Sequence, residues 1–207
     1  DNTLMGKFDC TERIALFEEE DTPLNCIIGA NWDTATIKGV LWGDSHSEHF
    51  RPVINQLATQ RNMSFLATDP ECPSYLDASL VKEYWPELPG YTEECTRRNR
   101  KIVRWLNENT DVQIVIIAAA WSGHIGMLYT EEQAYNKSSS PQVLENSREV
   151  GAQLSEFALQ KTLESIQSEN RHILLLGDMP RPNRNLNECA FSDMTWLLRS
   201  NCSRSYE

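Results

Sequence analysis

Short apolar runs alternate with longer amphipathic stretches along this chain of 207 residues. The apolar runs lie at residues 40–43, 63–67, 112–120 and 173–177. Runs of this length that are rich in Val, Ile, Leu and Ala predict strands, and the run at 112–120 is typical of a strand covered on both faces. The stretches between them carry apolar residues at helical spacing. This alternation favours an α/β fold with a largely parallel, doubly wound sheet.

The amphipathic stretches predict three helices. The first carries Phe50, Val53, Ile54, Leu57 and Ala58 at helical spacing. Pro52 lies within this pattern and predicts an irregular first turn, or a helix that begins near the proline. The second helix is expected over residues 93–109 and the third over residues 145–169. Because the apolar positions of the third helix change face, we expect it to pack on two neighbours or to bend near Lys161.

Three segments lack a clear period. Residues 68–92 are rich in Pro, Gly and acidic residues and predict a long surface loop. Residues 121–141 include a Ser-Ser-Ser-Pro run, which marks another loop. After Arg181 only residues 194–198 have a helical pattern. The sequence therefore shows four strands, with no fifth strand and no closing helix.

Length and composition narrow the possible functions. The chain is long enough to form one domain with a buried core. Its formal net charge is −11 and its pI is about 4.9, and with no evident Lys/Arg cluster we expect binding neither to nucleic acid nor to an anionic membrane. The longest apolar run, residues 114–121, is too short to span a bilayer, and Asp1 opens no signal peptide. Any targeting segment is expected outside this chain.

The six cysteines fall into three pairs that are close in sequence. These are Cys10 with Cys26, Cys72 with Cys95, and Cys189 with Cys202. Locality alone favours these pairs as disulfides, although other pairings of six cysteines are possible. None has the spacing of a CxxC zinc site, and the four histidines do not complete one, so no metal is expected. The alternative is buried free thiols in a cytosolic protein, but the paired pattern favours an oxidising compartment.

The clearest candidate for chemistry is Ser45, in the block Gly43-Asp44-Ser45-His46 between the first strand and the first helix. A hydroxyl there emerges at the carboxyl end of a strand, where amides of the first helical turn can stabilise an oxyanion. The same residue types are also common in an ordinary strand-to-helix turn. Asp44 is expected to fix this turn through hydrogen bonds to the backbone.

A second segment is expected to face Ser45. In doubly wound sheets, ligands bind at the carboxyl ends of strands where the strand order reverses. With the flavodoxin-like order 2-1-3-4-5, that point lies between the first and third strands. The third strand ends in Trp121-Ser122-Gly123-His124, which would then lie across a crevice from Ser45.

The serine block, the Ala119-Ala120-Trp121 ending of the third strand, the local cysteine pairs and the expected strand order together resemble an SGNH (GDSL-like) hydrolase domain. The chain is most similar to the periplasmic SGNH domain fused to bacterial acyltransferase-3 membrane proteins, which O-acetylate cell-surface polysaccharides. The likeness spans residues 39–180, and its most specific motif is Leu41 to His46. Residues 1–38 then correspond to a disulfide-containing linking segment, and residues 39–207 to the SGNH-like domain.

This resemblance implies a flavodoxin-like three-layer α/β/α fold with a mainly parallel sheet, in which the C-terminal strand and helix are missing from the sequence. It makes Ser45 the acyl-accepting nucleophile and its own N–H an oxyanion donor. In the family the base is the histidine of an Asp-x-x-His block near the C-terminus, with the aspartate orienting it. This sequence has no such block.

The family's usual oxyanion residues after the third strand are also replaced. Trp121 offers an apolar wall or an indole N–H to a sugar, or else is a core aromatic residue. Ser122 donates to the oxyanion or caps a turn. His124 is a fallback base, whereas we expect His46 to have a packing role. Asp178, after the fourth strand, is expected to be a turn residue rather than a catalytic orienter.

The resemblance implies a periplasmic O-acetyltransferase domain, tethered to the inner membrane by a segment outside this chain, that passes an acetyl group from Ser45 to a glycan hydroxyl. Acetyl-CoA is the expected ultimate donor, through the acyltransferase-3 membrane part, and the domain itself is expected to bind no cofactor. The same chemistry with water as acceptor would make a carbohydrate acetylesterase. A domain without a base would instead be a non-catalytic glycan-binding or partner-docking module.

Overall fold

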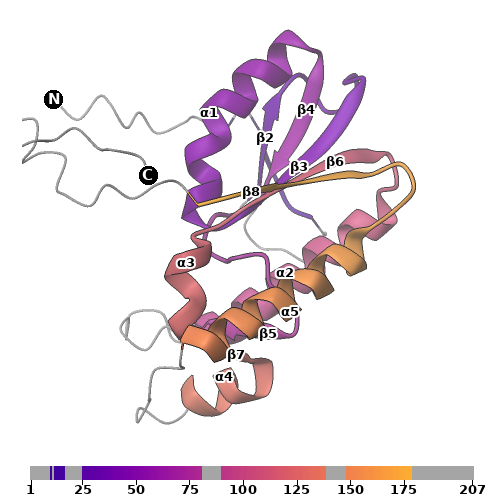
Figure 1. Ribbon diagram of the computed structural model, residues 1–207. Coiled ribbons are helices and arrows are strands. Elements are labelled where there is room, and N and C mark those ends of the chain that lie inside the picture. Colours follow the sequence, from indigo (N-terminus) through magenta and orange to yellow (C-terminus); the bar gives the residue numbers. More distant parts are fainter. Residues whose placement is uncertain (1–9, 11, 17–24, 81–89, 139–147, 179–207) are drawn as a thin grey trace, which may run out of the picture.

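The computed structural model describes residues 10, 12–16, 25–80, 90–138 and 148–178, apart from the side chains of residues 135–138. Its main feature is a six-stranded sheet with the order β1-β2-β4-β3-β6-β8 (Figure 1). The strands are β1 (Glu12–Ile14), β2 (Asn25–Gly29), β3 (Ile37–Gly43), β4 (Met63–Ala67), β6 (Val112–Ala118) and β8 (His172–Leu176). This sheet, with its helices, confirms the predicted mixed α/β fold.

The parallel part of the sheet has the strand order that the sequence predicts. β4, β3, β6 and β8 are parallel, which is the order 2-1-3-4 of the four predicted strands. The order reverses between β3 and β6, whose ends meet where Gly43 pairs with Ala118. β2 joins β4 in the antiparallel direction, and β1 joins β2. The predicted switch point is therefore present, at the carboxyl ends of β3 and β6.

Helices cover both faces of this sheet (Figure 1). α1 (Ser45–Gln60) lies on one face, and α2 (Tyr91–Glu108) and α5 (Arg148–Ile166) lie together on the other. Val40 and Trp42 pack in the core cluster with Ile166 of α5, whereas Leu41 packs in the cluster with Ala58 of α1. Successive strand residues thus point to opposite faces. Because both faces are covered, the strand sequences are continuous apolar runs.

The start of α1 is set by its N-cap and not by its proline. The helix begins at Ser45, well before Pro52, and Asp44 caps it. Proline has no N–H for the carbonyl four residues earlier, which here belongs to Glu48. Pro52 and Glu48 are both exposed, so water can replace the lost partner. The prediction of a helix that begins near the proline is therefore wrong.

The segment after β4 is not the long surface loop that its composition predicts. Residues 72–76 and 78–80 are buried, and β5 (Ala78–Leu80) pairs with β7 (Leu128–Thr130) in a second, two-stranded sheet. The Thr162 hydroxyl of α5 accepts a hydrogen bond from the Leu76 N–H and lies 2.9 Å from the Ser74 carbonyl oxygen. Polar side chains therefore satisfy the buried backbone of this segment. Its last part, residues 81–89, lies outside the described residues.

Short elements fill the segment after β6 in which the sequence shows no period. They are α3 (Trp121–His124), the short 3-10 helix η1 (Ile125–Met127), β7 and α4 (Glu131–Ser138). α5 contacts η1, β7 and α2, as the changing apolar face of this helix predicts. At Gly151 the approach is so close that a Cβ would lie 1.8 Å from the carbonyl oxygen of Ile125. The predicted helix at 194–198 lies outside the described residues.

Two strands of the sheet come from the segment that the resemblance assigns to a linker. β1 and β2 add to the edge of β4, and a disulfide joins Cys10 to Cys26 of β2. Part of residues 1–38 therefore belongs to the sheet. The domain boundary after residue 38 stays a prediction.

A basic cluster lies on α2, so the expectation that the chain has none is wrong. Its residues are Arg97, Arg98, Arg100, Lys101 and Arg104. The overall charge of −11 conceals them. Because neighbours on a helix surface are three and four residues apart, the helix brings Arg97, Arg100, Lys101 and Arg104 to one side. Arg98 instead pairs with Asp69, in the segment after β4.

Candidate active site at the carboxyl edge of the sheet

Ser45 lies at the carboxyl end of β3, where the sequence predicts it. The strand ends at Gly43, Asp44 is the N-cap of α1, and Ser45 is the first residue of the helix. Ser45 is exposed, whereas Asp44 and Ser47 are buried. The first N–H groups of a helix have no partner within it. Here Asp44 already accepts the N–H groups of His46 and Ser47. An oxyanion that forms at Ser45 would therefore meet the N–H of Ser45 itself and the positive end of the helix dipole.

Gly43 allows β3 and β6 to approach closely behind the serine. Its φ angle is +156°, and a Cβ at this position would lie 1.7 Å from the carbonyl oxygen of Ala118. No side chain fits in this space. Glycine is therefore required here by the close approach of the two strand ends, which also brings Asp44 next to Ala120.

The carboxylate of Asp44 connects the ends of β3 and β6. We call this region, which includes Asp44, Ser45 and Ala120, the serine junction. One oxygen, Oδ1, accepts the N–H of His46 at 2.8 Å and caps α1. The other, Oδ2, accepts the N–H of Ala120 at 2.9 Å and lies 3.1 Å from Nε2 of His124. The prediction that Asp44 fixes its own turn is confirmed. In addition, its carboxylate connects α1 with α3.

The pKa of Asp44 is lower than usual. Burial alone would raise this pKa, but the hydrogen bonds from His124 and from the amides of Ala120 and His46 together outweigh burial. Asp44 is therefore an anion near neutral pH, held by donors from both sides of the junction. A fixed charge of this kind holds the turn at Ser45 and the start of α3 in a constant relative position.

The structure assigns His124 a partner other than Ser45. Its Nε2 faces Asp44, and its Nδ1 is buried without a hydrogen-bond partner. In the described part of the chain, no hydrogen bond joins Ser45 to a histidine. The rings of His46 and His49 lie 5.5 Å apart on α1. The observed contact of His124 is thus one that positions α3, and its proposed role as a fallback base gains no support.

α3 is also attached to the end of β8. The indole N–H of Trp121 donates to the carbonyl of Leu176 at 2.7 Å, and the N–H of Ser122 donates to Oδ2 of Asp178 at 2.8 Å. The Trp121 indole N–H thus has a partner within the chain. Burial would raise the pKa of Asp178, but hydrogen bonds from the side chain and backbone of Ser122 and from the backbone of Trp121, together with the field of His46, lower it. Asp178 therefore links β8 to α3.

Tyr75 packs against this corner from the segment after β4. Its ring meets the rings of Trp121 and His124 edge to face, with centroids 5.8 and 6.4 Å away. Its hydroxyl lies 2.8 Å from the Ser155 hydroxyl oxygen, and burial raises its pKa. Tyr75 is buried, so its ring forms a wall behind α3.

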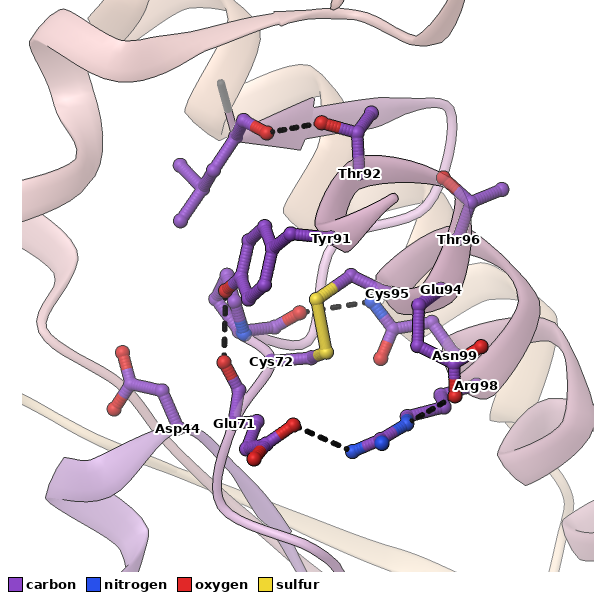
Figure 2. Close-up of a disulfide and its surroundings, with 12 residues drawn as sticks. Asp44, Glu71, Cys72, Tyr91, Thr92, Glu94, Cys95, Thr96, Arg98 and Asn99 are labelled. Atoms are coloured by element: carbon purple, nitrogen blue, oxygen red, sulfur yellow. Dashed lines mark hydrogen bonds and ion pairs between the residues drawn. A yellow bond between two sulfur atoms is a disulfide. The ribbon is translucent and has the colours of Figure 1, made fainter. Parts of the chain in front are cut away.

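A disulfide between Cys72 and Cys95 ties the same segment to α2 (Figure 2). Beside it, the guanidinium of Arg98 makes ion pairs with three carboxylates, those of Asp69, Glu71 and Glu94. The Tyr91 hydroxyl donates to the Glu71 carbonyl at 2.7 Å. Burial, followed by the charges of Asp44 and Glu71, raises the pKa of Tyr91. The first turn of α2 therefore lies within electrostatic reach of the serine junction.

Asn99 adds a third attachment of this segment to α2. Its side-chain N–H₂ donates to the carbonyls of Pro73 and Tyr75 at 2.8 and 2.9 Å. Its Oδ1 accepts the indole N–H of Trp42 at 3.2 Å. A single buried amide thus joins β3, α2 and the segment after β4.

Both described disulfides have the predicted partners. Cys10 pairs with Cys26 and Cys72 with Cys95, and no described cysteine is a free thiol. The third predicted pair, Cys189 with Cys202, lies outside the described residues. Structural disulfides of this kind fit an extracytoplasmic domain. Among the described helices, none has the length and apolar character to cross a bilayer.

A family model described as "SGNH domain (fused to AT3 domains)" matches residues 9–207. The chain belongs to this SGNH family. No curated protein and no solved structure matches it. Family membership connects the chain with acyl-transfer chemistry and with an acyltransferase-3 (AT3) membrane partner.

The sequence predicts the positions of Ser45 and Asp44 at the end of β3. It does not predict several other residues that build the serine junction. Tyr75 lies in a segment whose composition predicts an exposed loop, and the position of Asp178 after the fourth strand predicts a simple turn residue. Asp178 ends a parallel strand, as Asp44 does, and this shared position was the available signal. For Asn99 there was no signal beyond its place among the inward positions of α2.

Proposed function

We propose that this SGNH domain transfers an acetyl group through an acyl-serine on Ser45 to a hydroxyl of a cell-surface polysaccharide. The observation that carries the proposal is the position of Ser45. It is exposed on the first turn of α1 beside the buried Asp44, in a family that is fused to AT3 domains. At this position an accessible hydroxyl lies at the positive end of a helix dipole.

In the proposed reaction, Ser45 Oγ adds to the carbonyl carbon of the acetyl donor while a base takes the hydroxyl proton. The resulting oxyanion is stabilised by the Ser45 N–H and the dipole of α1, and loss of the leaving group yields the acetyl-serine. The base gives the serine proton to the leaving group. The glycan hydroxyl then adds to the ester as the base takes its proton, and collapse of the second oxyanion releases the acetylated glycan while the proton returns to Ser45 Oγ. Asp44 does not touch the reacting atoms but keeps α1 and α3 in place.

The AT3 membrane part supplies the acetyl group in this proposal, with acetyl-CoA as the ultimate donor. The domain itself acts in the periplasm, tethered to the inner membrane. Two observations support this arrangement: the family description names the AT3 fusion, and the two described disulfides suit an oxidising compartment.

The proposal is tested in cells that express the full-length protein with its membrane part. Ser45→Ala is compared with Ser168→Ala, which removes another exposed serine hydroxyl. The O-acetyl content of the surface polysaccharide is measured by NMR. We expect Ser45→Ala to lower the initial rate of acetylation at least ~10³-fold, since the nucleophile is lost. Ser168→Ala should keep the wild-type rate.

Two other results would contradict the transferase. Higher acetylation in Ser45→Ala than in the wild type would mean that Ser45 removes acetyl groups, as in a carbohydrate acetylesterase. Equal acetylation in both variants would mean that the serine has no chemical role, as in a glycan-binding or partner-docking module.

A further inference from the structure

A groove of about 500 Å³ runs along the exposed side of α2 and ends against the start of α4. Its lining includes four cationic residues, Arg97, Arg100, Lys101 and Arg104, and two acidic ones, Glu93 and Glu131. The lining residues by themselves thus carry more positive than negative charge, in a chain whose net charge is −11, and Glu94 and Glu108 lie beside them as ion-pair partners. It is distinct from the serine junction, whose residues do not line it.

The cations form a row because of the helix period. Arg97, Arg100 and Arg104 follow the spacing i, i+3 and i+7, so they lie on one side of the helix. At about 1.5 Å of rise per residue, the row is about 10 Å long. The side chains of these three arginines are 51%, 61% and 67% exposed. A ligand in the groove can therefore reach several guanidinium groups at once.

Each of these arginines has a carboxylate partner at the surface. Arg97 pairs with Glu94, Arg100 with Glu131 at 2.6 Å, and Arg104 with Glu108 at 2.8 Å. Exposed ion pairs of this kind are weak and exchange readily. An anionic group of a ligand can replace such a partner at small cost, and a guanidinium binds a carboxylate or phosphate in a bidentate manner.

The mixed lining indicates the ligand class. The arginines suit anionic groups, and the carboxylates of Glu93 and Glu131 accept hydrogen bonds from hydroxyl groups. Acidic sugars carry both kinds of group on one short unit. A flat anionic membrane matches a concave groove poorly, and the charge of −11 opposes its approach.

We propose that the α2 groove, lined by Arg97, Arg100, Lys101 and Arg104, binds an acidic polysaccharide. This inference rests on the proposed function, because it makes that polysaccharide the acceptor of the acetyl group. The groove begins at Thr92 and Glu93, in the first turn of α2. A polymer held along α2 is thereby kept at a high local concentration on the domain that carries Ser45.

Binding is measured by calorimetry on the Ser45→Ala protein, which cannot form an acyl-serine. The probes are a short oligogalacturonate and an uncharged maltooligosaccharide of equal length. The test variant carries Arg97→Gln, Arg100→Gln and Arg104→Gln. The control carries Arg61→Gln, Arg148→Gln and Lys161→Gln and removes the same charge elsewhere. Thermal unfolding verifies that both variants are folded.

We expect the oligogalacturonate to bind, to bind more weakly as salt is raised, and to lose at least ~10-fold in affinity in the test variant. The control should change affinity less than ~2-fold, because long-range charge alone is screened. The maltooligosaccharide should bind more weakly than the acidic probe. No binding of the acidic probe, or equal loss in both variants, overturns the proposal.

Vesicles of phosphatidylglycerol provide the last comparison. If the groove cations promote binding to these vesicles but not to oligogalacturonate, the surface contacts a membrane and the glycan proposal is wrong. None of these results depends on acyl transfer. Failure of the groove proposal therefore leaves the role of Ser45 to be judged by polysaccharide acetylation alone.

Discussion

Asp44, which is buried, and Asp69, which is half-buried, both follow parallel strands, yet their pKa values shift in opposite directions. Burial would raise both. At Asp44, hydrogen bonds from His124 and two amides outweigh burial and lower the pKa. At Asp69 burial prevails, because Arg98 is offset by the negative charge of Glu71. The arrangement of donors, and not burial alone, determines which carboxylate is held as a stable anion.

Arg98, which pairs with Asp69, is itself a well-stabilised cation. Its pKa is raised although its own burial opposes this, because it faces Asp69, Glu71 and Glu94 together. One cation that faces three carboxylates is well stabilised, whereas Asp69 is desolvated by burial and repelled by Glu71. The Asp44 region is therefore organised by short hydrogen bonds, and the Asp69 region by a disulfide and a shared ion.

Among the changes considered for the two regions, removal of the Asp44 carboxylate should cause the largest loss of stability. Asp44→Ala leaves the N–H groups of Ala120 and His46 and the ring of His124 without their acceptor. We expect the free energy of unfolding to fall by about 4 kcal/mol. Urea denaturation measures this loss. As a control, Asp33→Ala changes an exposed aspartate and should have an effect within about 0.5 kcal/mol; a similar loss in both variants would show that Asp44 is not a special anchor.

Removal of the Cys72–Cys95 disulfide should destabilise the Asp69 region without disturbing the serine junction. The two cysteines are 23 residues apart in sequence. Replacing both by serine should lower the free energy of unfolding by about 3 kcal/mol. Amide hydrogen exchange should accelerate in residues 72–80 but not at Ala120. Equal acceleration at Ala120 would mean that the two regions are one cooperative unit.

The link between Asp44 and α3 can be examined through His124. His124→Phe removes the Nε2 donor and should lower the free energy of unfolding by about 2 kcal/mol. His124→Gln retains a side-chain N–H and should cost about half as much. A double-mutant cycle with Asp44→Asn isolates the pair. A coupling energy near zero would mean that the contact adds nothing to the junction.

The smallest effect is expected in the pH dependence. The pKa of Asp44 lies below its unfolded value of about 3.9, so its stabilising contribution is complete above that pH and is lost as pH falls through the folded pKa. The pKa of Asp69 is raised, so its contribution is complete below about pH 3.9 and is lost as pH rises through the folded pKa. Stability differences from wild type for Asp44→Asn and Asp69→Asn, followed by urea denaturation from acid to neutral pH, should change in opposite directions. Parallel curves would contradict the pKa assignments.

The sequence predicted the regular part of the fold well. Residues 63–67 form a strand with the predicted bounds, and the switch point follows from strand order alone. These features arise from local apolar patterns and from rules of chain connection. Ser45 was found for the same reason, because a strand, a cap and a helix meet there within a few residues.

The rest depends on contacts between residues far apart in sequence. The segment around Tyr75 has a polar composition, yet it is buried because Thr162 and Asn99 supply its hydrogen bonds from α5 and α2. The partner of His124 was likewise hidden, since Asp44 lies 80 positions earlier in the chain. Patterns in the local sequence do not predict contacts between residues so far apart.

Labelling by a fluorophosphonate, followed by intact-protein mass spectrometry of the full-length protein, tests the role of Ser45 directly. The wild type, Ser45→Ala and Ser168→Ala are treated in parallel. We expect one adduct on the wild type and on Ser168→Ala, and none on Ser45→Ala, because only an activated serine reacts at a useful rate. An adduct that persists in Ser45→Ala, or a folded wild-type protein that is never labelled, would contradict the assignment of Ser45 as the nucleophile.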